Sequence, residues 1–340
     1  MRAFLAIPFL FCFFIVKISV YAQVAKDTTW KRSAYIEGTD DYLSIKLNGF
    51  NDTDRIQFGG VNYYDLRPNT DVRNRLSVNY KWLTVGFSFK IPTLFGNDDN
   101  SKGETESAGF STAINLDKWS FNFDYNDNKG YYLANSDDFP LVPSDNDFIL
   151  FPDFRTKNVR LDISYLTNAN FSLKALTSLT ERQLKSSGSF IPFLRLGYFN
   201  TIQENTDQLP FKRTNNYQGI LGIAYNHKFV FYENFYVGGV ASAGYGVVRS
   251  DIDITQRSAK QMTNTLFTYS YGVNLGYNAK RFFAGAVMNY GQYNYQNVGE
   301  IDLSAQRNSF EIFIGYRFRV PKFLRKPLNF VDETKEKILK

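Results

Sequence analysis

The sequence contains one histidine, His227, and this residue is its only candidate for a histidine general base. A histidine paired with a serine or an aspartate serves as the base in many lipid-modifying hydrolases and acyltransferases. His227 stands in Asn226-His227-Lys228, at the end of an alternating segment beside a tight turn, where a histidine is more often an interfacial residue. We therefore predict no catalytic site, and His227 remains the candidate base of an alternative, enzymatic function.

Metal-binding patterns are equally sparse. Cys12 is the only cysteine and lies in the apolar N-terminal segment, so the rest of the chain has none to ligate zinc or to form a disulfide. Three acidic stretches offer the oxygen ligands that calcium prefers, but none has the spacing of a calcium-binding loop. We interpret them as solvated loops and predict no metal and no cofactor. These stretches are Asn97–Asn100, Asp137-Asp138 and Asp145–Asp147.

Two further patterns have plainer interpretations than chemistry. The glycine-rich stretches Gly238-Gly239 and Gly244–Gly246 lack the following Lys-Ser/Thr of a phosphate-binding loop, and they are typical of strands that must bend. The stretch Lys185–Ser189 places serines beside a lysine that is a conceivable base, but its composition favours a polar turn.

The first 22 residues have the features of a signal peptide. Arg2 gives a positive start, Ala3–Val16 is apolar but too short to span a bilayer as a helix, and Val20-Tyr21-Ala22 ends in a small residue. We predict cleavage before Gln23, with a retained helical anchor as the alternative. The formal net charge of +6 then falls to about +4, which is too small and too dispersed to indicate nucleic-acid binding.

Strict alternation of side chains dominates the remaining chain. In Leu83–Ile91 every odd position is apolar and every even position is small, polar or charged, and Phe267–Asn278 repeats this pattern. Successive side chains of a strand point to opposite faces, so each segment has one apolar face. We predict an all-β fold, a transmembrane antiparallel up-and-down β-barrel of 12–14 strands. It would occupy residues 42–319, after a lead-in at 23–41 and before a basic periplasmic tail at 320–340.

Lipid is the expected environment of the apolar face. The segments run about 9–13 residues, which suits a tilted membrane crossing, and the opposite face carries Gly, Ser, Asn and Thr rather than dense charge. A closed barrel also removes the sheet edges that lipid cannot solvate. In the alternative, a soluble periplasmic β protein, the apolar side chains would instead fill the interior.

The lengths of the connections agree with this fold near the C-terminus but not upstream. Glu233-Asn234 and Ala279-Lys280 are tight, whereas 204–217, 251–263 and 296–306 are long, as expected for periplasmic turns and outer loops. With Phe171–Thr180 counted as a strand, the long segment Asn128–Arg155 falls on the wrong side. Either the strand count there is wrong by one, or that segment plugs the lumen.

Several blocks of sequence resemble a known family. They are Leu66–Asn69, Tyr80-Lys81-Trp82, Phe87–Pro92, Asn128–Tyr132, Glu181-Arg182-Gln183 and Lys185–Ser189. Together they resemble the domain-of-unknown-function family 4421 of Bacteroidetes-type bacteria, over nearly the whole mature chain. The resemblance implies an outer-membrane β-barrel and supplies no activity and no site residues.

The expected function is that of a non-enzymatic protein of the bacterial outer membrane, either a small pore or a surface or envelope interaction protein. The alternatives are a barrel-embedded enzyme that modifies lipid or envelope polymers through His227, and the soluble β protein. Expected partners are outer-membrane lipid and lipopolysaccharide, with an extracellular or envelope partner left open and no nucleic acid. Aromatic residues of the loops either bind a partner or carbohydrate or form an inward plug: Tyr131, Tyr132, Phe148, Phe151 and Phe154.

Overall fold

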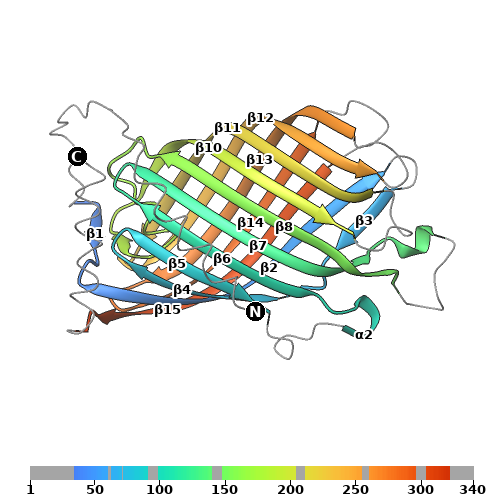
Figure 1. Ribbon diagram of the computed structural model, residues 1–340. Helices are drawn as coiled ribbons and strands as arrows, with labels where there is room; N and C mark the ends of the chain where they lie inside the picture. The colour runs from blue at the N-terminus through green and yellow to red at the C-terminus, as the bar shows by residue number, and fades with distance from the viewer. Residues whose placement is uncertain are drawn as a thin grey trace. The chain divides into compact units, whose positions relative to one another are not determined.

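The strands of the computed structural model form one antiparallel sheet that closes on itself (Figure 1). Strand β15 pairs with β2 from Ser304↔Gln57 to Arg319↔Tyr42, which joins the last strand to the first wall strand. Of the 13 strands in this sheet, β3 lies at one end and the other twelve make the wall, so the predicted all-β barrel of 12–14 strands is confirmed. The wall strands are β2 (Tyr42–Gly59), β4 (Arg73–Tyr80), β5 (Leu83–Phe89), β6 (Glu106–Asn115), β7 (Trp119–Leu133), β8 (Leu150–Tyr165), β10 (Ser187–Ile202), β11 (Phe211–Phe231), β12 (Phe235–Ile254), β13 (Lys260–Asn278), β14 (Phe282–Tyr295) and β15 (Ser304–Arg319).

Smaller elements complete the fold. Strand β3 is Tyr63–Arg67, β1 (Ile36–Gly38) pairs with β9 (Glu181–Gln183) in a separate two-stranded sheet, and helical structure is limited to α2 (Asp99–Lys102) and the 3₁₀ turn η2 (Ser136–Asp138) within the described residues. In that part of the chain no helix has the length and hydrophobicity of a membrane span.

The structure describes residues 34–59, 63–70, 72–90, 99–139, 148–203, 211–254, 260–295 and 304–321. The barrel belongs to the unit Arg32–Arg319, and a second unit comprises Met1–Lys31 with Val320–Lys340. The predicted signal peptide and most of the predicted basic tail therefore lie outside the described residues.

The apolar face of each wall strand points outward. At mid-strand, Leu221, Met288 and Ile312 are 68%, 61% and 57% exposed, whereas inward neighbours such as Ser77, Ser88 and Ser250 are buried. The outer wall is thus a continuous apolar surface of Leu, Val, Ile, Phe and Tyr side chains, as expected for a barrel in lipid. This orientation excludes the soluble alternative, in which those side chains would fill the interior.

Connections of different length gather at the two ends of the barrel. One end, which we call the turn end, holds the tight connections 81–82, 116–118, 232–234 and 279–281 and lies on the left of Figure 1. The opposite loop end holds the longer connections, with the exception of residues 166–186, and it includes the segment between β7 and β8. That segment covers residues 134–149, since β7 continues to Leu133 and β8 begins at Leu150. This segment therefore lies at the loop end, as expected for a barrel with short periplasmic turns and long outer loops.

The disagreement between the predicted strand count and the lengths of the connections comes from Phe171–Thr180. This segment was predicted as a strand and is not one. Residues 166–186 connect β8 to β10 and fold into the lumen at the turn end; we call this segment the plug. Phe171, Ala175 and Leu179 are fully buried there, and the backbone forms local turns, in which the N–H of Thr177 donates to the carbonyl of Leu173. The prediction failed because this short stretch also contains apolar residues two positions apart.

A hydrophobic cluster occupies the loop end. Tyr131, Phe151 and Phe154 pack there with Leu66 and Leu133, and the cluster reaches Ile252 on β12. A bulge in β7 at Gly130 turns Tyr131 and Leu133 toward the interior. Gly130 has a φ of +91°, and a Cβ there would lie 2.2 Å from the carbonyl oxygen of Glu104, so only glycine fits. Of the two predicted roles of the loop aromatics, inward packing is the one that these three residues adopt.

An ion-pair triad fixes β3 at this end. Asp65 is almost fully buried and pairs with Arg55 at 2.6 Å and with Arg67 at 2.8 Å. Burial by itself would raise the pKa of Asp65, but the hydrogen bonds and charges of Arg55 and Arg67 outweigh it and hold the pKa below its ordinary value. The carboxylate therefore contributes stability above pH about 4, and this contribution is lost as the pH falls through the lowered value.

A pair of arginine substitutions on β14 tests the orientation of the wall. Met288→Arg places a charge in lipid near mid-depth, at a cost of roughly 2–4 kcal/mol, and should prevent most assembly. Asn289→Arg places the same charge on the lumen side and should assemble nearly as well as the wild type. The measurement is the yield of heat-modifiable, folded protein in the membrane fraction. Equal yields of the two variants would contradict the orientation.

The triad at Asp65 predicts a pH-dependent opening of the loop end. Pepsin cleavage around β3 should be slow at pH 4 in the wild type and should rise as the pH is lowered further, because Asp65 becomes protonated. Asp65→Asn should be cleaved rapidly at pH 4 already. Asp153→Asn, which removes the exposed pair of Asp153 with Lys129, is the matched control and should behave like the wild type. Mass spectrometry of the peptides locates the cuts.

Candidate functional site

The plug is fastened to the wall through its main-chain carbonyl oxygens. Lys228 of β11 donates to the carbonyl of Ala175 at 2.7 Å, and Arg317 of β15 donates to the carbonyl of Leu179 through Nε at 3.0 Å and Nη2 at 2.6 Å. These carbonyls belong to the turns of the plug, where no regular helix or sheet supplies a partner for each of them. The cationic side chains of the wall satisfy them through charge-assisted hydrogen bonds.

Both of these cations are buried without a carboxylate at ion-pair distance in the described part of the chain. Arg317 is fully buried and also donates to Asn278 Oδ1 at 2.6 Å and to the carbonyl of Ala279. Lys228 lies with its Nζ 3.6 Å from the ring centroid of Tyr236, a cation–π contact. The plug carbonyls therefore share the compensation of two desolvated charges with groups of the wall and its turns.

The plug also has polar contacts of its own. Lys174 pairs with Glu181 at 3.1 Å, and Glu181 accepts a hydrogen bond from Ser172 Oγ at 2.5 Å. Arg182 pairs with Glu37 of β1 and donates to the carbonyl of Asn278 at 3.0 Å. Strand β1 pairs with β9 inside the plug, so the N-terminal segment and the turn between β13 and β14 both hold the plug in place.

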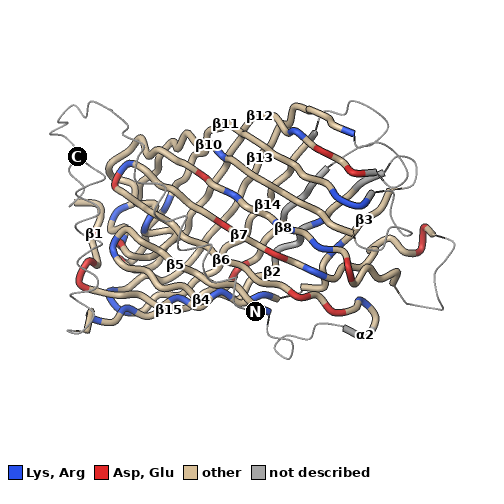
Figure 2. Tube along the Cα trace, in the orientation of Figure 1, with Lys and Arg blue, Asp and Glu red and all other residues tan. Residues whose placement is uncertain are grey.

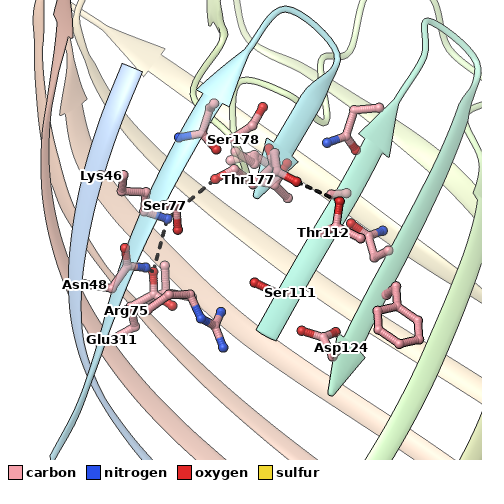
Figure 3. Close-up of a pocket in the computed structure, with 18 residues that line it drawn as sticks. Lys46, Asn48, Arg75, Ser77, Ser111, Thr112, Asp124, Thr177, Ser178 and Glu311 are labelled. Carbon is pink, nitrogen blue, oxygen red and sulfur yellow. Dashed lines mark hydrogen bonds and ion pairs between the residues drawn. The ribbon is translucent and has the colours of Figure 1, made fainter. Parts of the chain in front are cut away.

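A polar chamber of about 280 Å³ lies in the lumen against the plug (Figure 3). At about 30 Å³ for each water molecule in the liquid, this volume suits a small solute. Plug residues Leu176, Thr177 and Ser178 close one side, and most of the rest is Asn, Ser and Thr. The charged residues that line the chamber are Lys46, Arg75, Asp124 and Glu311.

A network of charged side chains crosses the lumen beside the chamber. The strands that contribute to it carry acidic and basic residues, which are red and blue in Figure 2. Arg160 pairs with Asp124 at 2.9 Å and with Asp162 at 3.2 Å, and Asp162 accepts a hydrogen bond from Arg195 Nε at 2.6 Å. Arg195 Nη1 then donates to the hydroxyl of Tyr293 at 3.0 Å. Three strands separate β10 from β14 in the sheet, so this last bond spans the interior. The network therefore places side chains across the middle of the lumen.

The structure places His227 on the outer wall, away from the chamber. Its Nδ1 lies 3.0 Å from the hydroxyl of Tyr225, and its ring contacts that of Phe229 in a tilted arrangement with centroids 4.2 Å apart. Both neighbours are exposed aromatic residues of the outer surface near the turn end. These contacts are those of an interfacial aromatic belt, and they bring His227 neither to a serine nor to a carboxylate among the described residues.

The other predicted candidates have structural roles where the structure describes them. Ser187 and Ser189 are buried and hold Asn168 and Thr167, while Lys185 lies over the ring of Tyr35 at 5.4 Å. Asp138 of η2 accepts a hydrogen bond from Asn135. The stretch Asp145–Asp147 and the first half of Asn97–Asn100 lie outside the described residues. Within the described residues, no group of three His, Cys, Asp or Glu side chains could hold a metal ion.

Substitution of Arg317 tests the fastening of the plug. Arg317→Met leaves the carbonyls of Leu179 and Ala279 without donors and should lower the free energy of unfolding by about 3 kcal/mol or more. Arg317→Lys should also be destabilised, because an ammonium group cannot serve acceptors in several directions as the planar fork does. Arg319→Met, an exposed position two residues along the same strand, should change it by less than about 0.5 kcal/mol. Urea unfolding in detergent micelles, followed by tryptophan fluorescence, measures the difference.

Comparisons with solved structures return bacterial outer-membrane barrels. The outer membrane protease OmpT from Escherichia coli is 12% identical with a TM-score of 0.35, and the match covers 83% of this chain and 98% of OmpT. The β domain of the Bordetella autotransporter BrkA is 12% identical with a TM-score of 0.40, covering 82% and 100%. The Pseudomonas putida toluene transporter TodX is 12% identical with a TM-score of 0.30, covering 82% and 90%.

Similarity at this level carries no argument about activity, and no curated protein matches the chain. A family model matches residues 26–318, which is most of the sequence. The outward apolar wall, the closed ring of strands and the short-turn end together place the barrel in the bacterial outer membrane. The chain belongs to the family described as Domain of unknown function (DUF4421), and it is an outer-membrane β-barrel with a plugged lumen.

Proposed function

We propose that the protein is a small gated pore for polar solutes, which the plug keeps closed in the structure described above. The observation that carries the proposal is a polar chamber whose floor is a segment fastened by side-chain hydrogen bonds to its main chain. Barrels of 8 strands have interiors filled by side chains, and barrels of 16–18 strands leave aqueous channels. A wall of twelve strands lies between these limits and has room for a passage once the plug moves.

The way in which the plug is attached to the wall supports a closure that can move. It is continuous with the wall only through β8 and β10, and its contacts with Lys228, Arg317 and Lys46 are hydrogen bonds to carbonyl oxygens. A hydrogen bond from a charged group contributes about 1.5–3 kcal/mol, so loss of one such bond shifts a closed–open equilibrium roughly 10- to 100-fold. Water or a solute that enters the turn end can replace these bonds one at a time.

The chamber itself favours passage over catalysis. Its lining carries amides, hydroxyls and paired charges, and His227 is not part of it. The small, polar inner face of β12 and β13, with Gly238, Ser242, Ser270 and Gly276 turned inward, continues these hydrogen-bonding walls along the strands.

Conductance in planar lipid bilayers tests the gated pore. The wild-type protein should be closed for most of the recording, with rare brief openings. Replacement of residues 168–185 by a short turn should give steady conductance. Lys228→Met should raise the open fraction roughly 10- to 100-fold, because it removes one charged donor to the plug.

The control is Lys280→Met, which also removes a cation of the turn end. The side chain of Lys280 is 75% exposed and makes only a long ion pair. It should conduct like the wild type. Resistance to heat and to protease shows that each variant is folded before recording. A folded barrel without the plug that remains electrically silent would overturn the pore and favour a surface or envelope interaction role.

A further inference from the structure

One cation in the chamber wall has no acidic partner. Arg75 of β4 donates from Nε to Ser88 Oγ at 2.9 Å, and its guanidinium lies 4.9 Å from the ring centroid of Phe50. Its two terminal nitrogens, Nη1 and Nη2, have no hydrogen bond and no ion pair with any described residue. In Figure 3 the guanidinium extends into the chamber, on the side of Asp124 and Glu311.

The acids that line the chamber are already paired. Glu311 lies 3.2 Å from Lys46 Nζ and also accepts a hydrogen bond from Asn48, and Asp124 lies 2.9 Å from Arg160. Each acid thus has its own cation, and the charge of Arg75 is left over. In a lumen enclosed by lipid and plug, an unmatched guanidinium attracts an anion more strongly than it would in bulk water.

Neutral donors gather beside Arg75 over a residue without a side chain. A Cβ placed on Gly86 of β5 would lie 2.7 Å from Ser111 Oγ, 3.1 Å from Ser77 Oγ and 3.5 Å from Arg75 Cδ. Because Gly86 has no side chain, these three side chains can approach one another closely above it, at the wall of the chamber. Neither serine hydroxyl makes a hydrogen bond with another described residue, so both can donate to a group that enters the chamber.

We propose that Arg75, Ser77 and Ser111, arranged over Gly86, form a binding site for the carboxylate or phosphate group of a small solute. The free end of a guanidinium presents Nη1 and Nη2 side by side, and this geometry matches two oxygens of a carboxylate or phosphate. The serine hydroxyls donate to the outer oxygens of the same group. As the selectivity site of a passage, it rests on the proposed pore. It identifies small anions as the solutes that the pore carries.

Calorimetric titration of the folded, full-length protein in detergent micelles, at constant ionic strength, tests the site. The probes are sodium acetate for the carboxylate, inorganic phosphate for the phosphate, and glucose as a neutral polar solute. Acetate, phosphate or both should bind, and glucose should not. Arg75→Gln should weaken anion binding by about tenfold or more, and Arg75→Lys should retain part of it.

Two further variants keep the test independent of the packing of Arg75 on Phe50. The double variant Ser77→Ala with Ser111→Ala leaves the guanidinium in place and should weaken binding several-fold. Arg249→Gln removes an exposed cation outside the chamber and should bind anions like the wild type. Absence of anion binding in the wild type, equal binding of glucose, or unchanged binding by Arg75→Gln would each overturn the site.

The outcomes separate this site from the pore. Anion binding that depends on Arg75 in a barrel that never conducts keeps the site and removes the pore. Conductance without anion binding keeps the pore and removes the site.

Discussion

The pairing of β15 with β2 is the interaction on which the rest of the structure depends. In hydrocarbon, a strand edge leaves main-chain N–H and C=O groups without partners, and each unpaired group costs several kcal/mol. The 16 residues of β15 are all paired with β2, which removes both free edges at once. The closed ring defines an interior separated from lipid, and only inside such a space can the cations, the chamber and the plug persist.

The arrangement of side chains in the interior follows from the closure of the barrel. Inward side chains on a wall of twelve strands do not fill the lumen by themselves, and hydrogen-bonding groups there must find partners or water. The barrel meets this demand differently along its length. Aromatic residues fill the loop end, an ion-pair network with a hydrogen bond across the lumen occupies the middle, and a segment of the chain itself occupies the turn end. The space between them is the polar chamber.

Local periodicity was sufficient to predict the wall. Alternation in Leu83–Ile91 gave β5 and its orientation, with Phe87 outward and Ser88 inward, because the period of two is a property of the strand alone. The same rule misassigned Phe171–Thr180. Phe171, Leu173 and Ala175 alternate over too few residues to define a strand, and the structure forms turns there.

The candidate site was much less accessible from sequence. Arg75, Lys228 and Arg317 stand at inward positions of alternating strands, and periodicity predicts that much. Their significance lies in which partners they have or lack, and those partners are 13 to 138 positions away in the chain. His227 drew attention as the only histidine, yet its odd position in β11 turns it to the outer wall. Pairing across the lumen is a property of the closed barrel and has no local pattern.

The contact between Arg317 and the plug has a consequence for biogenesis. Arg317 belongs to the last strand, so its donors reach Leu179 only when the C-terminal end of the chain docks against the first wall strand. The closing strand thus carries one of the side chains that fasten the plug. A barrel that closed before the plug was seated would keep the hydrogen bonds of Arg317 to Asn278 and Ala279 but would lack those to Leu179, so closure of the sheet and seating of the plug stabilise one another.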